Sequence, residues 1–236
     1  MAIVRTRAIL LKSYPFGESS EIAILFTEAI GKIRVSVKGA RRMKSAMRAK
    51  ILPFSISDVV VYVHPKKEVY NIKEAHVLKI FNRARDVKFQ KTVSNVLNII
   101  DSYVEEGPEG RKIFELLISF LEVLDGAEKR DDVLKLSFIL KFLKLVGHSP
   151  VLDRCVRCGT PHGLHYFSPE IGGTLCINCA GIVEDQQVIR INNGIRKTLI
   201  FVRDRPLSTV QNLSVNEGMI EKLIREYLEY HLGVTI

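Results

Sequence analysis

In the first third of the chain, apolar positions alternate with polar ones, which is the pattern of strands with one buried face. Residues 32–38 place three apolar side chains on one face and three cations on the other, in the order Lys32, Ile33, Arg34, Val35, Ser36, Val37 and Lys38. Residues 22–27, 59–63 and 69–80 add further β-rich runs with turn signals between them. About five strands in so short a segment predict a small barrel such as an OB-fold.

Beyond about residue 81 the apolar period becomes helical. Residues 113–124 carry one wide apolar stripe, and residues 131–146 are apolar nearly all round, which predicts a helix at the centre of its domain. A capping box, Ser214-x-x-Glu217, precedes a last helical run that Gly233 ends. We therefore predict an α+β protein, with an OB-fold domain over residues 1–80 and an all-α domain over residues 81–236.

All four cysteines lie in one short stretch of that helical domain. They form two C-x-x-C pairs separated by seventeen residues: Cys155, Cys158, Cys176 and Cys179. Pairs at this spacing are typical of a zinc ribbon or knuckle, in which each tight turn directs two sulfurs at one metal. We predict a module inserted at about residues 150–182 that holds one structural Zn²⁺. Rubredoxin-like iron uses the same ligands, and a redox dithiol is a weaker alternative.

The histidines between the two pairs, His162 and His165, are interpreted as surface side chains because four cysteines already close a tetrahedral shell. A closed shell leaves no position for a catalytic water, so we expect the metal to stabilise the fold and do no chemistry. Gly159 follows the first pair and Gly181 follows the second, where glycine relieves the tight backbone around the thiolates. Gly172 and Gly173 supply the reversal that returns the chain to Cys176.

Net charge changes the interpretation of the first domain. Residues 1–80 hold 15 Lys and Arg against 6 Asp and Glu, which is the whole net charge of +9, and the rest of the chain is balanced. Charge confined to one segment predicts a face that binds a polyanion. Residues 32–50 contain eight cations and no acid: Lys32, Arg34, Lys38, Arg41, Arg42, Lys44, Arg48 and Lys50. These eight residues are the candidate nucleic-acid contacts.

Single strands also need aromatic faces on which bases can stack. The aromatics of this region are Tyr14, Phe16, Phe54 and Tyr62. Phe54 and Tyr62 fit the barrel core equally well, whereas Tyr14 and Phe16 lie beside Pro15 and Gly17 in a predicted turn.

Motifs for catalysis are missing from the sequence. There is no P-loop, nucleophile elbow, H-E-x-x-H or G-x-G-x-x-G, so a binding protein is favoured over an enzyme. No apolar run approaches the roughly 18 residues that span a bilayer, and the N-terminus does not fit a secretory signal. We expect a cytoplasmic, nucleoid-associated protein whose thiols stay reduced.

The order of several short motifs resembles the RecO family of bacterial recombination mediators. They are Gly17-Glu18, Thr27 to Gly31, Lys38-Gly39-Ala40-Arg41-Arg42, Leu52-Pro53-Phe54, Gly147-His148-Ser149-Pro150, the paired C-x-x-C, and Tyr230-His231-Leu232-Gly233. The resemblance implies an N-terminal OB-fold and a helical domain with an inserted zinc module. On the matching motif, Lys38, Arg41 and Arg42 become the leading DNA contacts. Many members continue past the final Leu-Gly into a short basic tail, whereas this sequence ends at Ile236.

The resemblance also implies a function and partners. The family binds single- and double-stranded DNA, anneals complementary strands without nucleotide hydrolysis, and works with RecR to help load RecA onto SSB-coated single strands. It docks the acidic, apolar-tipped tail of SSB on its helical domain, for which Lys141 and Lys144 are hypothetical contacts.

Three other classes of function remain open. One is a zinc-containing OB-fold protein that binds RNA in the ribosome or transcription apparatus. Another is a structural adaptor for an acidic protein. A nuclease is least favoured, because no carboxylate cluster for a divalent metal is apparent.

Overall fold

A computed structural model describes residues 2–41, 50–108, 110–127, 130–183, 188–213 and 217–235. The chain divides into two compact units, Met1–Asp125 and Gly126–Ile236, which we call the barrel unit and the C-terminal unit. The predicted boundary at residue 80 differs from this division because helices α1 (Val87–Tyr103) and α2 (Arg111–Gly126) belong largely to the barrel unit. The position of the functional boundary stays a prediction.

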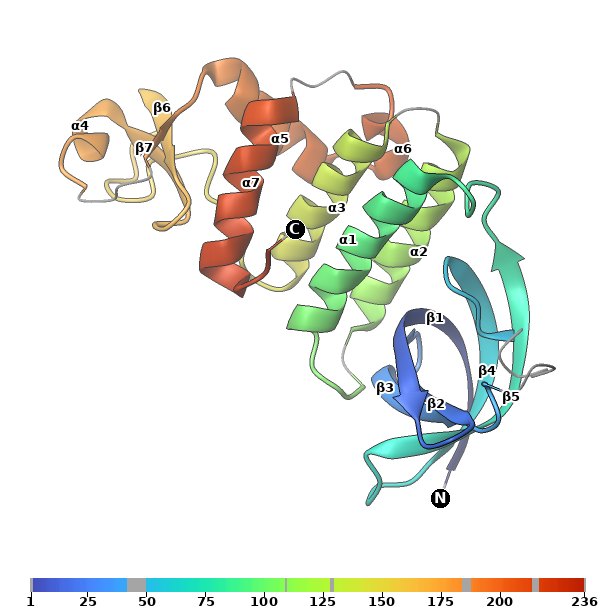
Figure 1. The fold of residues 1–236 in the computed structure, drawn as a ribbon. Coiled ribbons are helices and arrows are strands. Elements are labelled where there is room, and N and C mark those ends of the chain that lie inside the picture. The colour runs from blue at the N-terminus through green and yellow to red at the C-terminus, as the bar shows by residue number, and fades with distance from the viewer. Residues whose placement is uncertain are drawn as a thin grey trace. The chain divides into compact units, whose positions relative to one another are not determined.

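Five strands close into the predicted barrel (Figure 1). In chain order they are β1 (Ala2–Phe16), β2 (Ser20–Thr27), β3 (Gly31–Val37), β4 (Ser55–Val63) and β5 (Val69–Ile80). The strand order around the barrel is β1-β2-β3-β5-β4, with β1 antiparallel to β4 and β3 parallel to β5. This Greek-key closure is that of an OB-like fold and confirms the predicted fold class.

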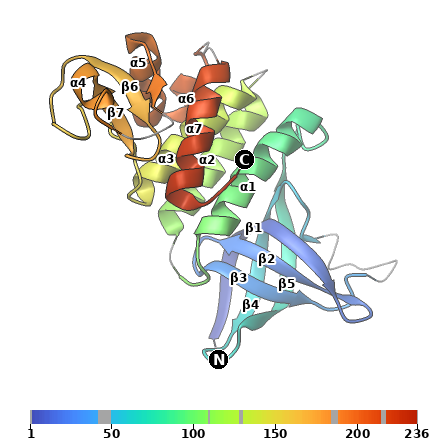
Figure 2. The same ribbon diagram turned by 60° about the vertical axis from the view of Figure 1, so that its left-hand side comes forward.

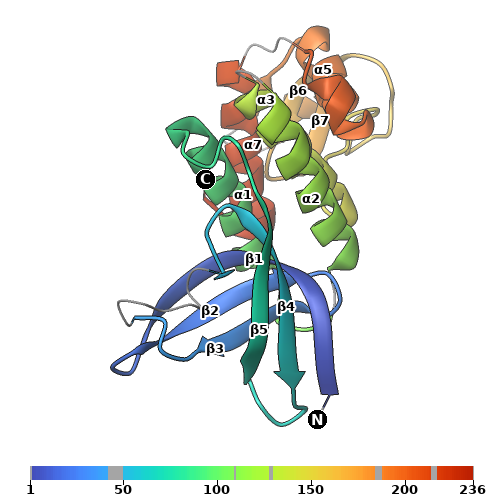
Figure 3. The same ribbon diagram turned by 90° about the vertical axis from the view of Figure 1, so that its right-hand side faces the viewer.

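Period-two alternation decides which side chains fill the barrel. The odd-numbered residues of β3, Ile33, Val35 and Val37, lie in the buried core cluster together with Ala23 and Leu25 of β2. The even-numbered residues of the same strand therefore lie on the outside of the barrel. Figure 2 shows β1, β2 and β3 as neighbouring strands on one side of the barrel, and Figure 3 shows β4 beside β5.

The strand β1 is not among the β-rich runs that the sequence pattern identified. It pairs with β4 through its first half and with β2 through its second half, and its register shifts between Leu10 and Lys12. A bulge of this kind bends a strand and lets it serve both edges of a small barrel. Tyr14 and Phe16, which were expected in a turn, lie at the end of this strand, and the turn follows at Gly17.

The C-terminal unit is built around helix α3 (Asp131–Leu145). It contacts α5 (Asn193–Asp204), α6 (Leu207–Val210) and α7 (Glu217–Leu232) (Figure 1). Most side chains from Val133 to Leu143 are buried, which confirms the prediction of a central helix. Gly147 and Gly233 have positive φ after α3 and α7, as expected of helix ends. The Ser214 end of the expected capping box lies outside the described residues.

The cysteine module, residues 151–191, interrupts this helical unit between α3 and α5. It contains β6 (Leu164–Ser168), β7 (Gly173–Cys176), the single turn α4 (Ile177–Ala180) and β8 (Ile189–Arg190). The three strands form a sheet in the order β7-β6-β8. An inserted module at this place in the chain confirms the expectation from the cysteine spacing.

Candidate metal centre and nucleic-acid interface

Four cysteine sulfurs converge at the predicted metal site. The Sγ atoms of Cys155, Cys158, Cys176 and Cys179 all lie within 4.8 Å of one another. Cys158 and Cys176 have their sulfurs 3.8 Å apart. A tetrahedral ion with metal–sulfur bonds of about 2.3 Å holds its thiolates about 3.8 Å apart. The cluster therefore fits one tetrahedral ion such as zinc.

Local backbone geometry explains how each C-x-x-C pair presents two sulfurs. In the first pair, the N–H of Gly159 donates to the carbonyl of Cys155 at 2.8 Å, and Gly159 has a φ of +76°. Glycine suits this left-handed position because it has no Cβ. In the second pair, Cys176 is the N-cap of α4 and Cys179 lies within its turn.

Backbone donors and neighbouring sulfurs shift the pKa values of two of the thiols in opposite directions. Burial alone raises the pKa of the Cys155 thiol, but N–H groups of Cys158, Cys176 and Arg157 donate to its sulfur and lower the pKa to about 6. For Cys179, burial and then the three adjacent sulfurs raise the pKa. Four thiolates this close repel one another, so a cation at their centre is needed for all of them to ionise.

Within the described ranges, this cluster is the one group of three or more His, Cys, Asp or Glu side chains close enough to share an ion. His162 and His165 are exposed and lie outside it. An all-thiolate shell leaves no open coordination position, which is the arrangement of a structural site.

Close backbone packing joins the cysteine module to the rest of its unit. A Cβ on Gly173 would lie 2.5 Å from the carbonyl oxygen of Val151, so the approach of these two segments requires glycine. From α7, the Tyr227 hydroxyl donates to the His148 carbonyl at 2.9 Å, and the Nε2 atom of His231 lies 2.7 Å from the Pro169 carbonyl. Helix α7 thus contacts both the module, at Pro169, and the segment just before it, at His148.

Lys32, the first predicted nucleic-acid contact, is buried. Its ammonium hydrogen-bonds the carbonyl oxygens of Asp101 and Val104 at the end of α1, the latter at 2.9 Å, and lies 3.1 Å from the Asp101 carboxylate. It therefore neutralises a helix C-terminus and satisfies carbonyls that have no partner within the helix. This contact is structural, so we leave Lys32 out of the DNA surface proposed below.

Arg34 and Lys12 lie on the same outer face and also meet acids. Arg34 Nε lies 2.5 Å from Glu106, and Lys12 Nζ lies 2.5 Å from Asp101. Burial favours the protonated form of Asp101, but hydrogen bonds from Lys12 and Lys32 outweigh it and lower the pKa of the carboxyl. Sequence reasoning missed these acids because they lie about 70 to 90 residues further along the chain.

The cations at the end of β3 differ from Lys32 and Arg34 because they are exposed to solvent. Lys38 and Arg41 are both exposed, and no described residue forms an ion pair with either of them. Lys50 is half-buried in the segment that leads to β4, and its carbonyl accepts a hydrogen bond from Ser57. The other predicted contacts, Arg42, Lys44 and Arg48, lie outside the described residues. Of the candidates that are described, Lys38 and Arg41 are best placed to meet a polyanion.

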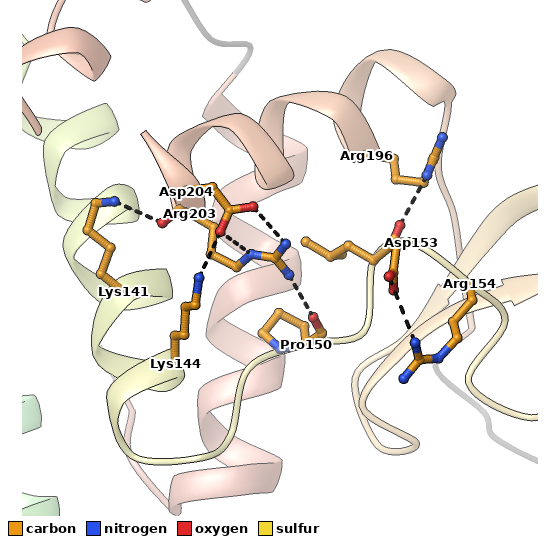
Figure 4. Close-up of polar contacts among 9 residues, drawn as sticks. Lys141, Lys144, Pro150, Asp153, Arg154, Arg196, Arg203 and Asp204 are labelled. Carbon is orange, nitrogen blue, oxygen red and sulfur yellow. Dashed lines mark hydrogen bonds and ion pairs between the residues drawn. The ribbon is translucent and has the colours of Figure 1, made fainter. Parts of the chain in front are cut away.

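Lys141 and Lys144, the hypothetical contacts for an acidic tail, reach toward the end of α5 (Figure 4). Lys141 donates to the carbonyl of Arg203 at 2.8 Å, and burial lowers the pKa of its ammonium. Lys144 lies 3.2 Å from Asp204, which Arg203 also binds. Both lysines thus stabilise the last turn of α5, and neither side chain is presented as a free cation.

An open depression of about 460 Å³ lies at the same end of α5. It is lined by Lys197, Ile200, Phe201, Asp204 and Arg205. The guanidinium of Arg205 lies over the Phe201 ring, 5.8 Å from its centroid. Its lining thus combines two exposed cations, one acid and two apolar side chains.

None of the described helices is long and apolar enough to cross a membrane.

Comparison with known proteins yields matches over almost the whole chain. The family profile "Recombination protein O N terminal" matches residues 1–81, and "Recombination protein O C terminal" matches residues 92–236. A DNA repair protein RecO of Alkaliphilus metalliredigens is 32% identical over 235 residues, which covers 98% of this chain and 94% of that protein. A DNA repair protein RecO of Caldanaerobacter subterraneus subsp. tengcongensis is 31% identical over 237 residues, with 98% and 94% covered.

Proposed function

Because the chain belongs to the recombination protein O (RecO) family of DNA repair proteins, we propose that it binds single- and double-stranded DNA and anneals complementary strands. It acts together with RecR to help load RecA onto single strands coated by SSB. No nucleotide is hydrolysed in this role, and the protein is a mediator rather than an enzyme.

The DNA surface in this proposal begins where β3 ends. Its supporting observation is the exposed pair Lys38 and Arg41, which opens a segment without any acid through Ser57. Arg42, Lys44, Arg48 and Lys50 continue that segment, and Arg34 joins them only where a phosphate replaces Glu106. In β3, Lys32 and Arg34 are paired with acids, whereas the cations that follow the strand are gathered in a segment without acids. Such a segment suits a phosphate backbone, which is recognised largely by charge.

The four-cysteine centre is assigned one Zn²⁺ with a structural role. The ion compensates four adjacent thiolates and locks the module that lies between α3 and α5. It takes no part in annealing.

The SSB tail is assigned to the depression at the end of α5. Lys197 and Arg205 supply positive charge for an acidic peptide, and Ile200 and Phe201 supply an apolar surface for its tip. This placement replaces Lys141 and Lys144 as direct contacts, because their ammonium groups already bind the end of α5.

The test of the proposed function is annealing of two complementary oligonucleotides, each coated with SSB, without ATP or Mg²⁺. The wild type should anneal them, and a Lys38→Glu, Arg41→Glu, Arg42→Glu variant should not. A control with Lys91→Glu, Lys112→Glu and Lys222→Glu changes three exposed lysines outside the basic segment and the net charge by the same amount. The control should retain annealing.

Failure of the wild type to anneal coated strands, with the fold intact, would contradict the mediator role. A parallel binding series with RNA of the same sequence then separates the remaining classes. Preferential binding of RNA would favour an RNA-binding factor. Weak binding of every nucleic acid at moderate salt would favour an adaptor for an acidic protein.

The tail assignment has its own test. Affinity for a peptide of the SSB C-terminus should fall at least tenfold in a Lys197→Glu, Arg205→Glu variant and stay unchanged in Lys222→Glu, Arg225→Glu, which alters exposed cations of α7. Equal affinities of the two variants would remove the depression as the docking site.

A further inference from the structure

Strand register places side chains from β1, β2 and β3 in rows across the outer face of the barrel. One row contains Lys12, Ile24 and Arg34, and the next contains Tyr14, Ile22 and Ser36. Phe16 pairs with Ser20, and continuing the same register by one step beyond β3 brings Lys38 into their row. The outer face therefore progresses from a row with two cations to two rows that each carry one aromatic ring on β1.

Acids cover the first part of this face and leave the second part open. In the row of Lys12 and Arg34, both cations meet carboxylates, namely Asp101 and Glu106. Further toward the hairpin, Tyr14 is 41% exposed and Phe16 is 59% exposed. Two aromatic side chains two residues apart on one strand lie on the same face, so their exposed surfaces are presented together.

The hairpin that carries these rings is held against the start of the basic segment. The N–H of Arg41 donates to the carbonyl of Ser19 at 3.0 Å, and its Nη1 atom lies 3.4 Å and 3.5 Å from the carbonyls of Gly17 and Glu18. Gly17 adopts a φ of +62°, which makes the turn compact. The rings and the cation are thus positioned together before any ligand arrives.

Exposed rings beside cations suit unpaired bases, because bases stack on aromatic faces while the connecting phosphates meet positive charge. A duplex buries its base faces and offers only its backbone to such a surface. The acids Glu18 and Glu21 of the hairpin repel phosphates, so we expect the uncharged bases to lie over the hairpin. The phosphates then lie toward Lys38 and Arg41.

Building on the proposed DNA binding, we propose that Tyr14 and Phe16 form a base-stacking platform that makes this surface bind single strands in preference to duplex. The ligand is an unpaired run of bases, with no requirement for sequence, because the rings offer no hydrogen-bond pattern for reading base edges.

The chain contains no tryptophan, so a single introduced indole reports on the platform directly. In Phe16→Trp, oligo(dT) should quench the indole fluorescence, and an abasic strand of equal length should leave it nearly unchanged although it binds. The matched control is Ile3→Trp, which places the indole at a 61% exposed position near the other end of β1 and should not respond. Equal responses to both strands at residue 16, or none to oligo(dT) when it binds, would overturn the platform.

Affinity gives the second readout. In Tyr14→Ala, Phe16→Ala the dissociation constant for oligo(dT) should rise at least about fivefold, whereas that for the abasic strand and for duplex should not change. The conservative variant Tyr14→Phe should behave as the wild type. Lys38→Glu, Arg41→Glu should weaken binding to all three ligands.

The two hypotheses fail differently. If the alanine variant weakens all ligands equally or none, the platform is wrong while the DNA surface stands. If the wild type binds none of these ligands, the proposed function itself is wrong.

Discussion

The barrel unit carries excess positive charge, and it leaves Lys38 and Arg41 exposed at the end of β3. In the C-terminal unit, residues 155–236 hold eight charges of each sign. There, Lys141 and Lys144 bind the end of α5. Acids of the barrel unit form ion pairs with only some of its cations. The C-terminal unit instead gathers sulfurs, which need a cation of their own. Under the proposed function, we therefore predict that DNA binding depends on the barrel unit, that metal-dependent stability depends on the C-terminal unit, and that separate mutations affect each.

Removing the metal should have the largest effect, and it should fall on stability alone. Structural zinc in small domains contributes on the order of 10 kcal/mol to folding. We expect Cys155→Ser, Cys158→Ser to lose the ion and to unfold the C-terminal unit at a much lower temperature, as followed by metal analysis and calorimetry. Oligonucleotide binding measured below that temperature should persist.

The control is His162→Ala, His165→Ala, which removes both exposed imidazoles between the cysteine pairs and should keep metal and melting temperature. An intact melting temperature together with lost DNA binding in the serine variant would show that the two units do not separate in this way.

Lys32 provides the next test, because it is a cation of the basic segment that serves the fold. Lys32→Met keeps most of the side-chain volume but leaves Asp101 and two carbonyls of α1 without its ammonium. Breaking such a buried ion pair should reduce the free energy of unfolding by about 3 kcal/mol, as measured in urea. The affinity of the folded protein for DNA should change little. A stable variant with weak DNA binding would return Lys32 to the DNA surface.

The salt dependence of binding sharpens the distinction between the two ends of β3. If roughly four to six phosphates are neutralised, the log–log slope for a single strand should be near −3 to −4. Lys38→Ala, Arg41→Ala should make it shallower by about 1.4, and Lys32→Met should leave it unchanged. Fluorescence anisotropy at several salt concentrations measures all three slopes, and identical slopes would contradict the assignment.

Acid should weaken the contacts between Asp101 and the cations Lys12 and Lys32 on the outer face of the barrel. Because the pKa of Asp101 is lowered in the folded protein, its contribution to stability is present above the carboxyl's unfolded pKa of about 3.9 and is lost as the pH falls through the lower folded value. Urea unfolding from pH 7 to pH 3 should therefore show a smaller loss for Asp101→Asn than for the wild type. A loss of the same size in both would show that Asp101 does not contribute.

Local patterns predicted the parts of this molecule that depend on local sequence. Alternation identified β3 and its buried face, and the two C-x-x-C pairs identified the four-cysteine cluster, because each depends on residues close together in the chain. The pairing of Lys32 with Asp101 depends on a contact across about 70 residues, so no local pattern contains it. For the same reason, charge alone did not distinguish Lys32 from Lys38.

That long-range contact also orders events during synthesis. The carbonyls that accept the Lys32 ammonium belong to Asp101 and Val104, so a chain that has emerged only as far as β5 still lacks them. Until α1 folds, the nascent barrel exposes Lys12, Lys32 and Arg34 together, without Asp101 and Glu106 to cover them. A truncated barrel ending near residue 80 would consequently be a less stable and less selective binder of polyanions than the same strands in the finished protein.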